Sequence, residues 1–227
     1  MIDPQFLKQV ELFSEMNEDD FSRIMLVARE RVYPKGATLF LEDEPGDCMF
    51  IIVKGAVKVY TLSPEGREKT IAILSRGDCL GEMAVLDGRP RSASAEAIEE
   101  TRAVIITRDD FRQVLLASPR TMLKVIELLS QRLRAVDRHI EYLALKDASA
   151  RLASFLLALA ERHGRPLDGK GHKIDIKLTH QELASLAGIS RETATRLINQ
   201  FQDAGLIETS GGWLVILDFK RLSMLAG

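Results

Sequence analysis

The sequence is poor in cysteine, in aromatic residues and in long apolar runs. Its 227 residues include two cysteines and one tryptophan, and 6% are aromatic. Cys48 and Cys79 have no second cysteine or histidine nearby at the spacing of a metal site, so we expect small buried residues and no disulfide framework. No run of about eighteen apolar residues occurs, and the start lacks a basic region followed by an apolar core. A cytoplasmic globular protein without a membrane span is therefore expected.

An excess of charge of one sign is also absent. The chain has 31 Lys and Arg against 33 Asp and Glu, a net charge of -2. Residues 146–227 carry 11 basic and 9 acidic side chains, which leaves 20 and 24 for residues 1–145. Because this asymmetry is small, a role in DNA binding must rest on a motif and not on bulk charge.

Short β-rich runs separated by glycines follow two short helices predicted within residues 4–28, the second of which begins after Asn17. Short strands with glycine turns are typical of a small barrel or sandwich. Asp109 is predicted to cap a short helix that ends at Leu116. The predicted strands are Ala37–Phe40, Cys48–Val53, Ala56–Leu62, Lys69–Leu74, Ser92–Ala97 and Arg102–Thr107.

A long helix is predicted from Pro119 to Leu145, because apolar residues recur there at alternating spacings of four and three. Such a heptad seam packs either inside its own domain or against a second copy of the helix. No other heptad-patterned helix exists in the chain to receive it, so we favour a homodimer. The predicted interface residues are Met122, Ile126, Leu129, Leu133, Val136, Ile140 and Leu143.

The remaining residues predict a winged helix-turn-helix. Asp147 is expected to cap a helix over residues 148–163, followed by a polar loop over 164–171 and a strand over 173–177. Thr179 is expected to cap a helix over 180–186, and after a tight glycine turn Ser190 is expected to cap a second helix that runs to about residue 203. A hairpin over 206–217 and a helix from Asp218 follow. The predicted fold is α+β, with a β-barrel domain over 1–118, a dimerisation helix over 119–145 and a DNA-binding domain over 146–227.

The second of these two helices carries Arg191, Glu192, Thr195 and Arg196 near its start, on the side away from the apolar residues. In the major groove, arginine donates two hydrogen bonds to guanine and glutamate accepts one from cytosine. Helical hairpins outside DNA-binding proteins show similar pairs as solvated charges, but the following β-hairpin favours the DNA-binding interpretation. Further candidate DNA contacts are Thr179, Gln181, Ser190 and Thr193.

The segment GEMAVLDGRPRSA, residues 81–93, suits a phosphate. Gly81 allows a close approach of backbone N–H groups, Arg91 supplies a two-donor fork and Ser92 adds a hydroxyl. Glu82 would repel an anion unless the ligand also presents a hydroxyl group. The combination favours a nucleotide whose phosphate meets Arg91 and whose ribose hydroxyl meets Glu82, although a plain surface Arg–Glu pair is the ordinary alternative.

At its full length the segment 81–93 resembles the phosphate-binding cassette of cyclic-nucleotide-binding domains. The sequence SRETATR, residues 190–196, resembles the recognition helix of the CRP/FNR family of bacterial transcription regulators. Barrel, long helix and winged helix-turn-helix come in that family's order over nearly the whole chain. The resemblance implies a homodimer that binds cyclic AMP in the barrel and palindromic DNA with TGTGA half-sites. It also implies a contact of the loop near 161–171 with RNA polymerase.

Carried over to this sequence, the ligand site comprises Gly81, Glu82, Met83, Ala84, Arg91, Ser92, Val136 and Asp137. The last two stand where the family's dimer helix offers threonine and serine to the adenine. Val136 cannot donate or accept a hydrogen bond, whereas Asp137 can accept one from an amino group of adenine or guanine, or pair with Arg132 or Arg138. Because the intact cassette still favours a cyclic phosphate, cyclic AMP is the first choice of effector, with cyclic GMP, a cyclic dinucleotide or no ligand as alternatives.

Other classes of protein fit less well. An iron–sulfur regulator needs about four cysteine ligands, and a haem sensor needs an axial ligand, yet His139 is placed on the polar side of the long helix. Neither a nucleophile–base pair nor a metal-ligand spacing occurs, so no enzyme and no metal are expected. A cyclic-nucleotide-binding module that acts through protein partners is the alternative from a different class.

Overall fold

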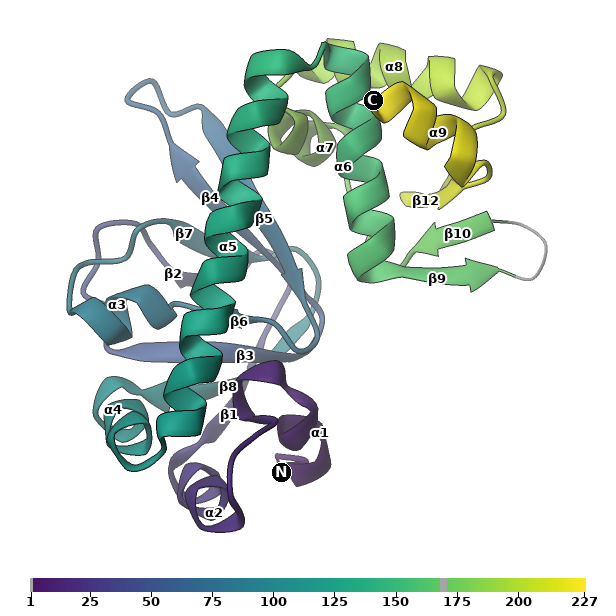
Figure 1. Cartoon of the computed structure of the whole chain (residues 1–227). Coiled ribbons are helices and arrows are strands. Elements are labelled where there is room, and N and C mark those ends of the chain that lie inside the picture. Colours follow the sequence, from purple (N-terminus) through teal and green to yellow (C-terminus); the bar gives the residue numbers. More distant parts are fainter. Residues whose placement is uncertain (1, 168–170) are drawn as a thin grey trace. The chain divides into compact units, whose positions relative to one another are not determined.

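The computed structural model describes residues 2–167 and 171–227 and divides the chain into two compact units (Figure 1). One unit comprises Met1–Leu62 and Ile71–Ala135, and the other comprises Ser63–Thr70 and Val136–Gly227. The long helix α5 (Pro119–Leu145) runs from the first unit into the second, with the bounds that its heptad pattern predicted. No helix among the described residues is long and apolar enough to cross a membrane.

Two four-stranded sheets form the core of the first unit (Figure 1). The expected barrel is therefore not closed, and the two sheets remain open at their edges. All six predicted strands are present, one with the predicted bounds (β4) and five with one or both ends shifted by one or two residues, whereas β1 and β6 were missed. One sheet has the order β1 (Arg29–Tyr33), β8 (Thr101–Thr107), β3 (Cys48–Lys54), β6 (Cys79–Leu80). The other has the order β2 (Thr38–Phe40), β7 (Ser94–Ala97), β4 (Ala56–Leu62), β5 (Glu68–Ser75).

Strand β3 shows how the sequence builds two cores. Its side chains alternate between the two faces of the sheet, as in any strand. Met49 and Ile51 join the cluster that the helices cover, while Phe50 and Ile52 join the cluster between the sheets. A strand buried on both faces reads as a continuous apolar run, which is the pattern from Met49 to Val53.

Short helices cover the outer face of the first sheet: α1 (Pro4–Gln9), η1 (Glu11–Phe13), α2 (Glu18–Val27) and α4 (Arg108–Ala117). Asn17 caps α2 as predicted, since its side chain accepts a hydrogen bond from the Asp20 N–H. The predicted cap of α4 was wrong: Thr107 caps this helix and Asp109 lies inside its first turn. Thr107 takes the cap because its hydroxyl accepts from the Asp110 N–H.

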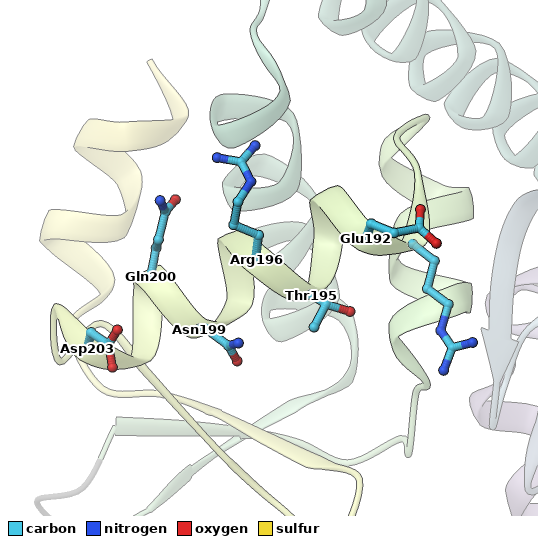
Figure 2. Close-up of a pocket in the computed structure, with 7 residues that line it drawn as sticks. Glu192, Thr195, Arg196, Asn199, Gln200 and Asp203 are labelled. Carbon is cyan, nitrogen blue, oxygen red and sulfur yellow. The ribbon is translucent and has the colours of Figure 1, made fainter.

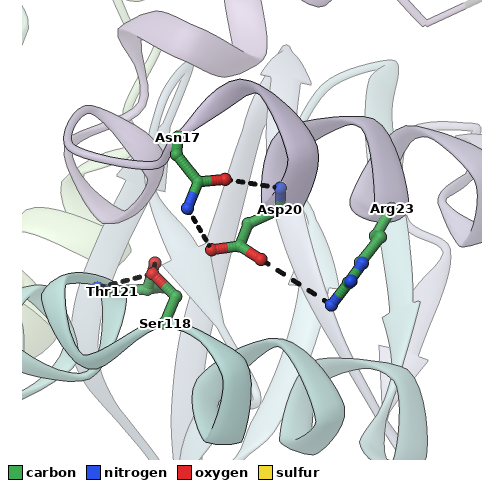
Figure 3. A network of polar contacts seen from close by, with 5 residues as sticks. All are labelled: Asn17, Asp20, Arg23, Ser118 and Thr121. Atoms are coloured by element: carbon green, nitrogen blue, oxygen red, sulfur yellow. Dashed lines mark hydrogen bonds and ion pairs between the residues drawn. The ribbon is translucent and has the colours of Figure 1, made fainter.

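Buried polar side chains fix where α2 and α5 begin (Figure 3). Asn17 donates to the buried Asp20 carboxylate at 2.9 Å, and that carboxylate lies 3.9 Å from Arg23. At the start of α5 the Thr121 hydroxyl donates to the buried Ser118 hydroxyl at 2.9 Å. Each buried polar group thus has a partner within its own turn.

The second unit is a winged helix-turn-helix. It contains α6 (Ala148–His163), α7 (His180–Ala187), α8 (Arg191–Asp203) and α9 (Phe219–Ala226). Asp147, Thr179 and Ser190 cap α6, α7 and α8, as predicted, and Asp218, which was expected only as the start of the last helix, caps α9. The four-stranded sheet has the order β11 (Ile207–Ser210), β12 (Trp213–Ile216), β10 (Gly171–Ile174), β9 (Gly164–Leu167).

Three expectations in this unit were wrong. The loop predicted over 164–171 contains strand β9 and the first residue of β10, and the strand predicted over 173–177 is β10, which runs from Gly171 to Ile174. Residues 168–170 of the predicted polymerase-contacting loop lie outside the described residues.

His139 is half-buried and does not lie on a polar face: its ring packs edge-on against Phe155 with 5.3 Å between centroids. Burial lowers the pKa of His139, so its ring is neutral near pH 7.

Arg151 joins the start of α6 to the turn of the helix-turn-helix. Its guanidinium donates to the Lys146 carbonyl at 3.0 Å and to the Ala187 carbonyl at 3.0 Å. Both acceptors are backbone groups at helix ends, which lack partners within their own helix. Arg151 therefore fixes the orientation of α7 and α8 relative to the end of α5 within this unit.

The predicted seam of α5 is largely uncovered in the single chain. Leu129 is half-buried against the core of the first unit. The other six predicted seam residues are 41% to 62% exposed: Met122, Ile126, Leu133, Val136, Ile140 and Leu143. A stripe of this kind on one helix is typical of a surface that a second helix covers.

Candidate functional sites

The cassette predicted over residues 81–93 contains a short helix, α3 (Glu82–Asp87), which the sequence analysis did not predict. Gly81 and Gly88 flank it in the left-handed region, with φ of 76° and 77°. At Gly81 a Cβ atom would also lie 2.5 Å from Nη1 of Arg91. Only glycine satisfies both the conformation and the close approach.

Arg91 lies inside the unit with 4% of its surface exposed, next to the start of α3. Its Nη1 donates to the Gly81 carbonyl at 2.8 Å and its Nη2 donates to the Cys48 carbonyl at 2.7 Å. The guanidinium also lies over the Phe40 ring, 4.3 Å from its centroid. Its Nε is buried and has no hydrogen-bond partner among the described residues.

Glu82 is 2% exposed and makes an ion pair through Oε1 with Arg132 of α5. Arg132 also donates to the Cys79 carbonyl. The alternative that Arg132 pairs with Asp137 is thus not what the structure shows: the guanidinium turns to the more deeply buried carboxylate, where an unpaired charge would cost most. Oε2 of Glu82 is buried and lacks a hydrogen-bond partner within the described chain.

Sequence reasoning missed two residues that hold the cassette in place. Arg108 donates through Nη2 to the Gly46 carbonyl at 2.6 Å and to the Ala84 carbonyl at 2.8 Å. A Cβ atom at Gly46 would lie 2.4 Å from the Ala84 Cβ and 2.9 Å from Nε of Arg91. In the sequence Gly46 looks like any other glycine in a turn, so its close packing against Ala84 and Arg91 could not be predicted.

The other predicted ligand contacts differ in burial. Ala84 is buried, Met83 is exposed, and the exposed Ser92 hydroxyl lies 3.9 Å from the Met83 sulfur. Val136 and Asp137 are exposed and belong to the second unit, so their predicted contact with the base stays a prediction.

Among the described residues three buried side-chain atoms lack a hydrogen-bond partner: Glu82 Oε2, Arg91 Nε and Arg108 Nε. The first two test whether the cassette fits the nucleotide that the sequence predicts. Oε2 of Glu82 is an acceptor and Nε of Arg91 is a donor, and both are buried. A buried polar atom without a partner is costly unless something satisfies it. A ligand that presents a hydroxyl group and an anionic oxygen would satisfy both, and a cyclic nucleotide presents both. Within residues 2–167 and 171–227, no three His, Cys, Asp or Glu side chains gather as metal ligands would.

The second site is the exposed face of α8 (Figure 2). The apolar residues Ala194, Leu197, Ile198 and Phe201 face the core of the unit. The opposite face is a shallow open hollow. It is lined by Arg191, Glu192, Thr195, Arg196, Asn199, Gln200 and Asp203. The predicted base-reading residues are therefore brought together with Thr195, which was placed on this side but assigned no contact. Asn199, Gln200 and Asp203 were missed although they follow at helical spacing.

Helix caps use several of the hydroxyls predicted to contact phosphates. Ser190 accepts a hydrogen bond from the Thr193 N–H at 3.1 Å. Thr179 forms a reciprocal capping box with Glu182, and Gln181 is exposed on α7 beside it. These residues fix the N-termini of α7 and α8, and their contact with DNA stays a prediction.

Glu192 is held as a carboxylate at the start of α8. Its own backbone N–H, the Ser190 hydroxyl and Arg191 lower the pKa of Glu192, outweighing the small effect of desolvation. In the described part of the chain no salt bridge joins Glu192 to Arg196, although they are four residues apart. The carboxylate is therefore available as an acceptor on the exposed face.

The fold and the two sites define a class of protein: a DNA-binding regulator with a second domain for an anionic ligand. Residues 30–118 match the family model described as "Cyclic nucleotide-binding domain". Residues 150–225 match the model described as "Crp-like helix-turn-helix domain".

Similar proteins come from several bacteria. The "CRP-like cAMP-activated global transcriptional regulator" of Mycobacterium tuberculosis is 36% identical over 194 residues, 86% of each chain. The "cAMP-activated global transcriptional regulator CRP" of Escherichia coli is 31% identical over 185 residues, 81% of this chain and 87% of that one. The structure of FixK2 from Bradyrhizobium japonicum matches with a TM-score of 0.79 and 27% identity, covering 88% of this chain and 98% of that one. The chain belongs to the CRP/FNR family of transcription regulators.

Proposed function

We propose that the protein is a homodimeric transcription regulator that binds cyclic AMP in its first unit and palindromic DNA with TGTGA-like half-sites through α8. The observation that carries the ligand part is the buried, unpartnered pair of Glu82 Oε2 and Arg91 Nε. Relatives named as cAMP-activated favour cyclic AMP over the other cyclic nucleotides.

In this proposal Arg91 and Glu82 divide the ligand between them. The Arg91 guanidinium faces the cyclic phosphate with the N–H groups that Gly81 and Cys48 leave free. Oε2 of Glu82 accepts the ribose 2′-hydroxyl. Since Oε1 of the same carboxylate pairs with Arg132, ligand binding is linked to α5.

Asp137 and Val136 do not determine which base the ligand carries, whereas the cassette determines that it carries a phosphate. Asp137 accepts an amino hydrogen from adenine or guanine alike, while Val136 offers only packing. Cyclic GMP and a cyclic dinucleotide are the alternatives that this pair admits.

The ligand is tested by calorimetric titration of the full chain with cyclic AMP, cyclic GMP and cyclic di-GMP. Arg91→Ala should abolish binding of the one nucleotide that the wild type binds. Arg89→Ala is the matched control, because Arg89 is an exposed arginine two residues away. If the wild type binds none of the three, the ligand part of the proposal fails and the protein is a ligand-independent regulator.

The homodimer rests on the exposed seam of α5. Leu133 is 62% exposed in the single chain, and a second copy of the helix would bury it. Leu133→Asp should convert the dimer to a monomer in sedimentation, whereas Leu26→Asp, on α2 and even more exposed at 77%, should not. An unchanged sedimentation coefficient in Leu133→Asp would contradict this interface.

DNA binding distinguishes the regulator from a module that acts through protein partners. A duplex is first selected from a random pool by the wild type. Arg191→Ala and Arg196→Ala should each weaken binding to it by about 1 to 3 kcal/mol, the value of a bidentate base contact. Unchanged binding in both variants would favour the protein-partner module. The contact with RNA polymerase near residues 161–171 remains a proposal that the family resemblance alone supports.

A further inference from the structure

We propose that Thr195 reads a thymine in the major groove through its methyl group, as a base contact additional to the arginines and Glu192. The inference rests on the proposed DNA binding by α8. It identifies the chemical group on the DNA that the centre of the α8 face recognises, namely the 5-methyl group of thymine.

Thr195 lies in the middle of that face. It follows Arg191 by four residues and Glu192 by three, so the three side chains are neighbours on one side of the helix. All three line the same hollow, and Figure 2 shows Thr195 between Glu192 and Asn199 along α8. If the charged residues of α8 contact one base pair, the adjacent base pair would therefore lie against Thr195.

The hydroxyl of Thr195 already has a partner. Its Oγ1 lies 3.0 Å from Nδ1 of His180, the first residue of α7. This hydrogen bond forms in either tautomer, because the hydroxyl both donates and accepts. Thr179 and Glu182 in turn fix the start of α7 through the capping box, so His180 is held on an ordered turn.

The position of the hydroxyl decides the position of the methyl. Threonine is branched at Cβ and occupies staggered rotamers, so the hydrogen bond that fixes Oγ1 also fixes Cγ2. Because the hydroxyl bonds to His180 of α7, we infer that the methyl group is the part of Thr195 that contacts a base in the hollow.

Thymine presents an apolar counterpart in the major groove. Its 5-methyl group is the one apolar group among the major-groove edges of the bases, and threonine methyl groups contact it. Arg191, Glu192 and Arg196 carry the chemistry for guanine and cytosine, so a methyl contact adds a base type that these charged groups do not read. Burial of one methyl against another should change affinity by about fourfold.

The test replaces thymine by deoxyuridine, one position at a time, in the duplex selected by the wild type. This substitution removes only the methyl group. Binding of the full chain is measured for the wild type, for Thr195→Ser, which keeps the hydroxyl and lacks the methyl, and for Thr195→Val, which keeps a methyl and lacks the hydroxyl.

The wild type should lose about fourfold in affinity at one thymine per half-site and at no other. Thr195→Ser should bind the thymine and deoxyuridine duplexes equally, and Thr195→Val should still distinguish them. If the wild type binds the duplex but no deoxyuridine position matters, or if Thr195→Ser discriminates as the wild type does, the contact is refuted while the proposed function stands. A wild type that selects no duplex at all refutes the DNA-binding proposal, and this contact with it.

Discussion

The cassette and the exposed face of α8 both depend on charged side chains, but they hold them in opposite ways. Glu82 and Arg91 are buried and fixed by carbonyl groups, an aromatic ring and a counter-ion from α5. Arg191 and Arg196 are exposed and line an open hollow. The cassette needs contacts from other segments of the chain to hold its charged side chains, whereas the arginines of the second site all lie on one helix, α8.

This difference predicts how each site responds to change. A buried charge needs its partners, because an unpaired one retains its full desolvation cost. Substitutions around the cassette should therefore reduce stability and ligand binding together. Substitutions on the α8 face should reduce DNA binding alone, since exposed positions without a packing role change stability by about 0.5 kcal/mol or less.

The largest effect is expected for Arg132→Ala. The change leaves the buried Glu82 carboxylate without its counter-ion, so we expect a loss of about 2 to 4 kcal/mol in the free energy of unfolding of the first unit. Because Arg132 is itself partly exposed, the loss should lie below that of a fully buried pair. Urea denaturation followed by circular dichroism measures it.

Arg134→Ala is the control for Arg132→Ala, since Arg134 is an exposed arginine on the same helix. Equal stability losses in the two variants would show that the Glu82 pair adds nothing beyond a surface charge. The buried cassette would then depend on its charged partners no more than the exposed site does.

Gly46→Ala should have the next largest effect. The added Cβ would meet the Ala84 Cβ at 2.4 Å, and we expect a destabilisation of about 1 to 3 kcal/mol and weaker nucleotide binding. The second substitution Ala84→Gly removes the atom that clashes, so the double variant should recover part of the loss in stability. No recovery would mean that the strain arises at Arg91 Nε and not at Ala84.

The two sites also differ in how far the sequence could predict them. On α8 the cap, the helical period and the neighbouring charges are all local, and Arg191, Glu192 and Arg196 were placed on one face correctly. At the cassette the local motif gave Glu82 and Arg91. The partners that fix them come from elsewhere in the chain, and no local pattern indicates such contacts.

The fold shows the same division between local and distant information. Helices with strong caps were predicted to the residue, as α6 and α8 were. The two-residue strand β6 is defined by its pairing with β3, a partner distant in the sequence. Closure of the sheets into a barrel depends on strand pairing across the whole unit, which glycine spacing cannot specify.

Glu192→Gln tests the exposed site with a smaller expected effect. The carboxylate should favour cytosine at one position by about 1 kcal/mol, and the neutral amide should lose that preference. Because the pKa of Glu192 is lowered, the carboxylate stays ionised well below neutral pH, and protonation sets in only once the pH falls to that pKa. The ratio of affinities for cytosine and mismatched duplexes should therefore be the same at about pH 8 and pH 5.5.

Protein stability should be unchanged in Glu192→Gln, which is the feature that separates it from the cassette variants. Thermal unfolding of the variant and the wild type gives this comparison directly. A destabilised Glu192→Gln would show that the α8 face is coupled to the packing of its unit.

The smallest effect concerns the rates at which the two thiols react. Burial raises the pKa of Cys79 to about 12, and burial together with Asp47 raises the pKa of Cys48, so little thiolate of either exists at about pH 8. We expect slow reaction of the half-buried Cys48 with a disulfide reagent, and reaction of Cys79 only after unfolding. Because Sγ of Cys48 lies 3.7 Å from Nη2 of Arg91, bound nucleotide should slow Cys48 further. Mass spectrometry of the labelled chain, with Cys48→Ser as control, follows both sites. Fast labelling of Cys79 in the native protein would mean that strand β6, beside the cassette, unfolds locally. The cassette would then be exposed to solvent, as the α8 face is, and the contrast between the two sites would not hold.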